Sequence, residues 1–81
     1  MAAYKDLAGV LNQLALTSGF DEARAANAWA GTSGLETLGA LNKKAVNAFG
    51  NWKDFDGVCN QLAGTNGLAG VGALNKLAGN T

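Results

Sequence analysis

The sequence contains no histidine and a single cysteine, Cys59. A lone cysteine excludes an internal disulfide, and without histidine the common zinc-binding patterns cannot form. The chain also lacks a Ser/His or Cys/His pair for nucleophilic catalysis, a P-loop, and a glycine-rich dinucleotide motif that follows a strand. We therefore expect that the protein is not an enzyme and that it binds no metal and no cofactor.

An excess of charge of either sign is also missing, since Lys and Arg number 6 and Asp and Glu number 6. Nucleic acids and anionic membranes are bound by clustered basic faces, so neither is an expected partner. No apolar run approaches the ~20 residues that a membrane-spanning helix needs, and the first residues do not resemble a signal peptide. With 48% apolar residues, the 81-residue chain is expected to form one small domain, residues 1–81.

What the chain does contain is a repeat. Asn follows a pair of small or apolar residues at five places, namely Asn12, Asn27, Asn42, Asn60 and Asn75. Successive members of this set are 15, 15, 18 and 15 positions apart. A 15-residue period with one insertion of three predicts five structural units.

Each unit holds one amphipathic segment with its own start and stop signals. In the third unit, Ser33 followed by Glu36 is typical of a capping box, and Leu35, Leu38 and Leu41 recur at helical spacing. The same reasoning predicts N-caps at Ser18, Ser33, Asn51 and Asn66 and left-handed C-terminal residues at Gly31, Gly50, Gly64 and Gly79.

These signals predict helices at about 4–15, 19–30, 34–49, 52–63 and 67–78, joined by turns of two to four residues. Turns this short make successive helices antiparallel neighbours. The predicted fold is all-α: five short antiparallel helices from a 15-residue repeat, arranged as a compact bundle or a short solenoid. The insertion is expected to prolong the third helix and to gather Val46, Phe49, Trp52 and Phe55 at the centre of the core.

The repeated Asn has two interpretations. Its amide could hydrogen-bond free backbone groups of a neighbouring turn and so fix the spacing of the units, or five such amides could bind a sugar or a peptide. No aromatic platform repeats beside them, so we favour the structural role.

Glycines recur three positions before the repeated Asn, inside the expected helices, at Gly9, Gly39, Gly57 and Gly72. Each costs roughly 1 kcal/mol relative to Ala. Either the missing Cβ lets another backbone approach closely, which we favour, or the helices are broken there. Close packing predicts that Gly39→Leu and Gly72→Leu destabilise the domain.

Four residues stand out as candidates for function. Cys59 occupies a slot that is Leu or Ala in other units, which favours a small buried residue over a reactive thiol. Lys44 is a charge in an otherwise apolar slot, and it either reaches water at the domain edge or contacts a partner. Trp29 and Trp52 are hot-spot residue types, although burial in the core is the commoner role of Trp in a small domain.

The run from Ala25 to Ala45, AANAWAGTSGLETLGALNKKA, supports a family resemblance. It resembles the Ala-Ala-Asn-x-Trp-Ala-Gly-Thr-x-Gly-Leu and Gly-Ala-Leu-Asn-x-Lys-Ala repeats of virion structural proteins from tailed phages that infect actinobacteria. The segment 56–68, DGVCNQLAGTNGL, resembles a later copy, so the similarity covers about residues 9–79. Leu16 in place of a turn glycine and the insertion at 46–51 depart from the pattern.

The resemblance implies a non-enzymatic structural protein of the virion that binds capsid or tail subunits in multiple copies, with a decoration or minor capsid protein slightly preferred. It implies no catalytic or ligand-binding residues. The alternative is a host-surface or glycan-binding module of a phage tail, and a third class, an enzyme or nucleic-acid protein, is disfavoured. We expect the protein to self-associate or to dock on a larger virion protein through a face that includes Trp29 or Trp52 together with Lys44.

Overall fold

The computed structural model describes residues 6–45 and 54–80, and these residues form helices, turns and loops without a strand. The helices are α1 (Leu7–Ala15), α2 (Glu22–Ala30), α3 (Thr37–Lys44), α4 (Phe55–Ala63) and α5 (Gly70–Ala78). The all-α class, with one helix in each 15-residue unit, is therefore confirmed.

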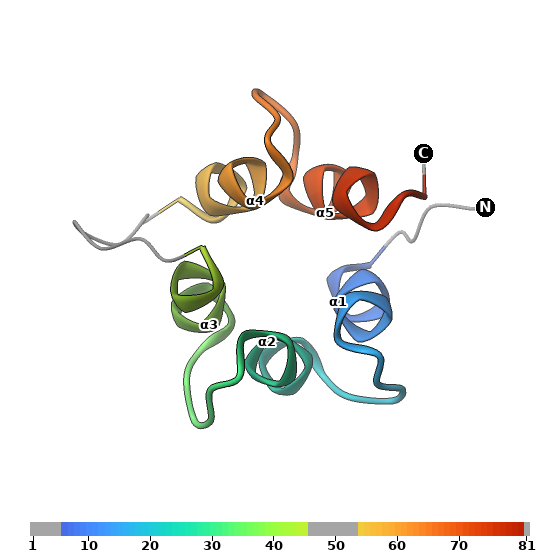
Figure 1. The fold of residues 1–81 in the computed structure, drawn as a ribbon, viewed down its shortest axis with the longest axis vertical. Coiled ribbons are helices and arrows are strands. Elements are labelled where there is room, and N and C mark those ends of the chain that lie inside the picture. Colours follow the sequence, from blue (N-terminus) through green and yellow to red (C-terminus); the bar gives the residue numbers. More distant parts are fainter. Residues whose placement is uncertain (1–5, 46–53, 81) are drawn as a thin grey trace.

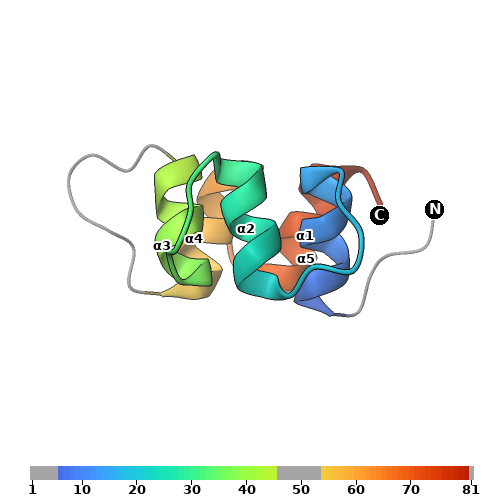
Figure 2. The same ribbon diagram turned by 90° about the horizontal axis from the view of Figure 1, so that it is seen from below.

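The five helices stand side by side in a ring (Figure 1). Each helix contacts the helices before and after it in sequence, and α5 contacts α1, so the ring is closed. The Cα positions extend over 35 × 27 × 14 Å, and the helix axes lie along the shortest of these directions (Figures 1 and 2). The fold is thus a flat, single-turn ring whose thickness is about one short helix, since nine residues rise about 13 Å.

The helices are parallel, and the expected antiparallel arrangement is wrong. The backbone N–H of Gly70, at the start of α5, donates to Asp56 Oδ1, near the start of α4, at 2.7 Å. Lys44 and Trp29 meet near the ends of α3 and α2. In the side view, each helix begins at one face of the ring and ends at the other (Figure 2).

The helices are parallel because the loops between them are longer than the two to four residues that the sequence indicated. Loops 16–21, 31–36 and 64–69 separate consecutive helices. Six extended residues span about 20 Å, which is enough to run back along the outside of a 13 Å helix and start the next one at the same face. The error arose because every helix start was placed about three residues too early.

The N-caps show the same shift. Asp21 and Asp54 are N-caps whose carboxylates accept from the backbone N–H groups of Arg24 and Asp56, and Asp6 caps α1 in the same way. The capping box expected at Ser33 is wrong, because Glu36 is itself the N-cap of α3 and its side chain makes no cap hydrogen bond. Ser18 and Asn66 lie in loops, and Asn51 lies outside the described residues.

Three of the four predicted C-terminal glycines are confirmed. Gly31, Gly64 and Gly79 are C-caps in the left-handed conformation, with φ of 74°, 70° and 82°. Gly50 lies outside the described residues, and α3 ends at Lys44 rather than extending to 49. In α1 the left-handed position is held by Leu16, with φ of 61° and 92% of its surface exposed. A side chain in this conformation costs roughly 1–2 kcal/mol.

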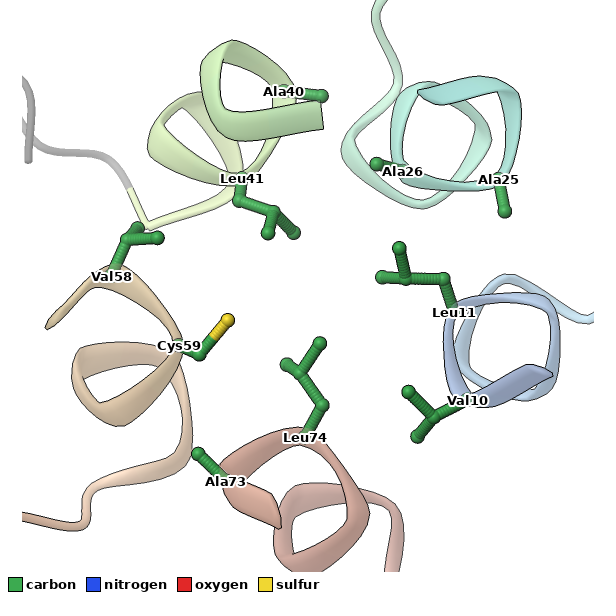
Figure 3. Packing of buried hydrophobic residues seen from close by; sticks show 10 residues of the cluster. All are labelled: Val10, Leu11, Ala25, Ala26, Ala40, Leu41, Val58, Cys59, Ala73 and Leu74. Carbon is green, nitrogen blue, oxygen red and sulfur yellow. The ribbon is translucent and has the colours of Figure 1, made fainter. Parts of the chain in front are cut away.

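The core is built from the two residues that precede each repeated Asn. All ten are fully buried: Val10, Leu11, Ala25, Ala26, Ala40, Leu41, Val58, Cys59, Ala73 and Leu74. The residue directly before the Asn points into the ring, as Leu11, Leu41 and Leu74 show, while the earlier one points toward the preceding helix (Figure 3). No aromatic residue is among the ten. Of the expected aromatic cluster, only Phe55 is described, and it packs on the core without full burial; Val46, Phe49 and Trp52 lie outside the described residues.

The close-packing explanation of the helix glycines is wrong at the two positions chosen to test it. A Cβ added at Gly72 would meet nothing within 4 Å, and one at Gly39 would make an ordinary contact of 3.7 Å with Leu35 Cβ. The crowded glycine is Gly70, where a Cβ would lie 2.6 Å from Phe55 Cδ2 and 3.1 Å from Asp56 Oδ1. The basis for expecting Gly39→Leu and Gly72→Leu to overpack a helix contact is thereby removed.

Candidate interaction surfaces

The repeated Asn joins each helix to the loop that follows it. Asn27 Nδ2 donates to the carbonyls of Ala23 (2.7 Å) and Leu35 (2.8 Å), and its Oδ1 accepts from Thr32 Oγ1 (2.8 Å) and Leu35 N–H (3.2 Å). Asn12 and Asn60 make the same four bonds within their own units. An amide has two donor hydrogens and two acceptor lone pairs, so these three side chains have no capacity left for a sugar or peptide. The structural role of the Asn is confirmed there.

The closure between α5 and α1 uses a different arrangement. Asn80 stands five residues after Asn75, where the first, second and fourth units carry the Thr that bonds the Asn. Asn80 Nδ2 donates to Asn75 Oδ1 at 3.0 Å, and it exchanges hydrogen bonds with Gln13 at 2.6 and 3.1 Å. Asn80 is 4% exposed. Sequence reasoning missed this residue, although the replacement of Thr by Asn in the last unit was visible.

Two of the three predicted interface residues lie together. The ammonium of Lys44 lies 5.1 Å from the centroid of the Trp29 ring. Trp29 is half-buried and packs on the core, whereas Lys44 is exposed. The two occupy the same slot in neighbouring units, two residues after Asn27 and Asn42, so parallel helices bring them side by side. Trp52 lies outside the described residues.

The Trp29–Lys44 pair accounts for a charge in an apolar slot. A cation over an indole ring is stabilised by about 0.5–1 kcal/mol at an exposed site. A second pair of this kind, between Arg24 and Phe20, has the guanidinium carbon 4.2 Å from the ring centroid. Both aromatic residues are half-buried, and each has a cation over its ring.

Because the helices are parallel, the ring has two different faces. The N-terminal face, where the helices begin, carries all six acidic residues of the chain, each of them exposed: Asp6, Asp21, Glu22, Glu36, Asp54 and Asp56. The C-terminal face, where they end, carries Lys43, Lys44 and Lys76, also exposed. Acids at helix starts and bases at helix ends each contribute roughly 0.3–1 kcal/mol through the helix dipole. Arg24 lies near the N-terminal end of α2, and Lys5 and Lys53 lie outside the described residues.

Two equivalent grooves lie between a helix and the loop that follows it. One, of about 530 Å³, is bordered by Asp21, Arg24 and Leu35; the other, of about 400 Å³, is bordered by Asp54, Gly57 and Leu68. Both are shallow and open to solvent. The third position before the Asn is Arg in the first groove and Gly in the second, so the two share a shape but not a common charge.

Cys59 is the only cysteine, and it is fully buried in the core, as predicted. Burial, together with the nearby carboxylates of Asp56 and Asp54, raises the pKa of its thiol to about 12. A thiol with this pKa is uncharged at neutral pH and is a poor nucleophile and metal ligand.

Within residues 6–45 and 54–80, no group of three His, Cys, Asp or Glu side chains could hold a metal ion. Nor does any helix in this part of the chain combine the length and apolarity that a bilayer crossing demands. Comparisons with protein-family models, with curated proteins and with solved structures find no match to this chain.

Proposed function

We propose that the protein is a non-enzymatic structural component of a phage virion that binds capsid or tail subunits, with a decoration or minor capsid role preferred. The support from the sequence is the resemblance of its repeats to modules of virion proteins. The support from the fold is a thin ring with two broad faces, a shape suited to lying flat on a larger assembly.

The observation that carries the proposal is the Trp29–Lys44 pair at the C-terminal ends of α2 and α3. A half-buried Trp beside an exposed cation has the composition of an interface hot spot, since Trp is enriched among the residues that dominate binding energy. The α1 end of the same face adds Leu16, whose side chain is 92% exposed. This face therefore carries a half-buried aromatic side chain and an exposed aliphatic one, and aromatic residues are enriched in protein-binding patches relative to ordinary surface.

The glycan-binding alternative loses its main structural support, because three of the five Asn amides spend their full hydrogen-bonding capacity within the chain. Neither groove contains a repeating aromatic platform in the described residues, since Phe20 borders only one of them.

Mass spectrometry of purified particles provides the first test, and the protein should be present in a fixed ratio to the major capsid or tail protein. The second test compares Trp29→Ala, Trp52→Ala and Lys44→Glu for incorporation into particles, with melting by circular dichroism to check folding. Arg24→Glu is the matched control, because it reverses an exposed cation on α2 at the opposite face. Absence of the protein from particles overturns the proposal, as does normal incorporation of folded Trp29→Ala and Lys44→Glu variants.

A further inference from the structure

The two faces of the ring have opposite charge. Six exposed carboxylates and one described cation, Arg24, occupy the N-terminal face, and three exposed lysines occupy the C-terminal face. Although the formal net charge is zero, the described charges are therefore separated along the short axis of the ring. The parallel helix dipoles point along this axis, and each acidic or basic cluster matches the dipole end at which it lies.

Both faces also have an apolar centre. Leu7, Leu38, Phe55 and Val71 cover the core from the helix starts, and Leu14, Trp29 and Leu62 cover it from the helix ends; all are only partly buried. Leu77 is 37% exposed in the last turn of α5. An apolar centre with a charged perimeter is the usual anatomy of a protein interface.

Leu16 is the most exposed large hydrophobic residue described. It stands at the C-terminal face in a left-handed conformation that glycine holds in the second, fourth and fifth units. A leucine at this position loses backbone energy and gains no contact within the ring, since 92% of its surface is exposed. A second molecule could provide the contact that the ring itself does not.

We infer that copies of this ring stack head to tail, with the acidic N-terminal face of one copy on the basic C-terminal face of the next. Stacks in which two like faces meet are disfavoured by charge. Two N-terminal faces, for example, would bring six carboxylates against six carboxylates. Head-to-tail stacking pairs carboxylates with lysines and places Leu16 and Trp29 against the apolar centre of the neighbouring copy. It also aligns the helix dipoles of successive rings end to end.

Such a contact is heterologous, meaning that the two partner surfaces differ, so it does not stop at a dimer. However many rings are joined, one end of the stack keeps a free N-terminal face and the other end keeps a free C-terminal face, so the product is a column. The inference does not depend on the proposed virion role, because it concerns the purified chain alone. Failure of virion incorporation and failure of stacking are therefore separate results.

The experiment measures self-association of the purified chain by sedimentation velocity over a range of protein and salt concentrations. The wild type should form species that grow beyond dimers as concentration rises, and added salt should weaken the association because it screens the facing charges. Glu22→Lys with Glu36→Lys replaces two of the six carboxylates of the N-terminal face, and Lys43→Glu with Lys76→Glu replaces two of the three lysines of the C-terminal face. Each double variant alone should associate at least about tenfold more weakly than wild type.

An equimolar mixture of the two double variants is the decisive arm. The C-terminal face of the first variant and the N-terminal face of the second are both unaltered, so one wild-type contact can form between them, and the mixture should give a one-to-one complex that does not grow further. Leu16→Gly is the arm that separates docking from folding, because it should keep or raise the melting temperature while weakening association.

Three results would overturn the inference. The first is a wild type that stays monomeric at the highest concentration and lowest salt. The second is a dimer that does not grow and that responds to Leu16→Gly but not to Glu22→Lys with Glu36→Lys, which indicates pairing of two C-terminal faces. The third is a mixture of folded double variants that forms no one-to-one complex. If the charge variants unfold, the salt dependence of the wild type and the effect of Leu16→Gly decide the question.

Discussion

Neighbouring helices are held together in two different ways: one at the joints between consecutive units, and another at the joint between α5 and α1 that closes the ring. Between α2 and α3, a covalent loop passes the Asn27 side chain, which bonds to both backbone groups of Leu35 just before the next helix begins. Between α5 and α1 no loop exists, and two side-chain amides, those of Gln13 and Asn80, bond to each other across the gap. The unit-to-unit joint is thus made mainly with backbone groups, whereas the closing joint depends on side chains alone.

Because of this difference, we expect the two kinds of joint to affect different properties of the protein. The loop joints satisfy backbone groups that would otherwise be left without partners, and such groups are costly to bury. The closing amides lie where water can compete, since Gln13 is only half-buried. We therefore expect loop joints to contribute more to folding free energy, and the closing joint to determine whether a folded chain forms a ring or an open arc.

The largest effect is expected from Asn27→Ala, which removes all four hydrogen bonds of one loop joint. The backbone N–H and C=O of Leu35 lose their side-chain partner, so the free energy of unfolding should fall by about 3 kcal/mol. Urea titration followed by circular dichroism measures the change. Ser33→Ala, at an exposed position in the same loop, is the control and should change stability by no more than about 0.5 kcal/mol. Equal losses for both variants would contradict the role given to the Asn.

A second effect is expected at the joint between α4 and α5, where Gly70 lies against Phe55 and Asp56. Gly70→Ala should lower stability by roughly 1–3 kcal/mol, because the added methyl group must displace the Phe55 ring. Gly72→Ala is the matched change two residues later, and it should raise stability by roughly 0.5–1 kcal/mol, since its Cβ meets open space and Ala is the better helix former. Thermal melts of both variants test the pair. A destabilising Gly72→Ala would revive the close-packing explanation that the structure contradicts.

The smallest effect is expected at the closing joint. Asn80→Ala removes two hydrogen bonds to Gln13 and one to Asn75, and it should cost about 1–2 kcal/mol. Hydrogen exchange should speed up selectively at the ends of α1 and α5, because local opening follows the weakest joint. A double-mutant cycle with Gln13→Ala isolates the direct coupling between the two amides. Uniform exchange in all five helices would show that the closing joint is no weaker than the others.

The features that follow from local sequence were predictable, and those that depend on chain direction were not. The 15-residue period, the buried slot that holds Leu11 and Leu41, and the left-handed Gly31 all depend on residues within one unit. The start of α3 was misplaced because Ser33 followed by Glu36 matches a capping box, whereas Glu36, the actual N-cap, is not a preferred N-cap residue and makes no side-chain cap hydrogen bond. An acid stands six residues before the repeated Asn in four of the five units, and this regularity was the available signal for the correct starts.

The candidate surfaces were predictable in part. The slot alignment singled out Trp29 and Lys44 separately, and the parallel direction of α2 and α3 is what places one over the other. Antiparallel helices would have put the ends of α2 and α3 on opposite faces, so the wrong direction concealed the contact. For the same reason, the division of charge between two faces could not be seen from a net charge of zero.

Closure of the ring has a consequence for how such a protein can change in evolution. An open solenoid can lengthen by duplication of a unit at either end, because its terminal repeats have a free side. Here α5 already contacts α1, so a sixth unit could enter only if every joint between helices changed its angle to accommodate a wider ring and the core acquired larger side chains to fill it. Lineages with this architecture should therefore vary the loops and the two faces while keeping the number of units constant.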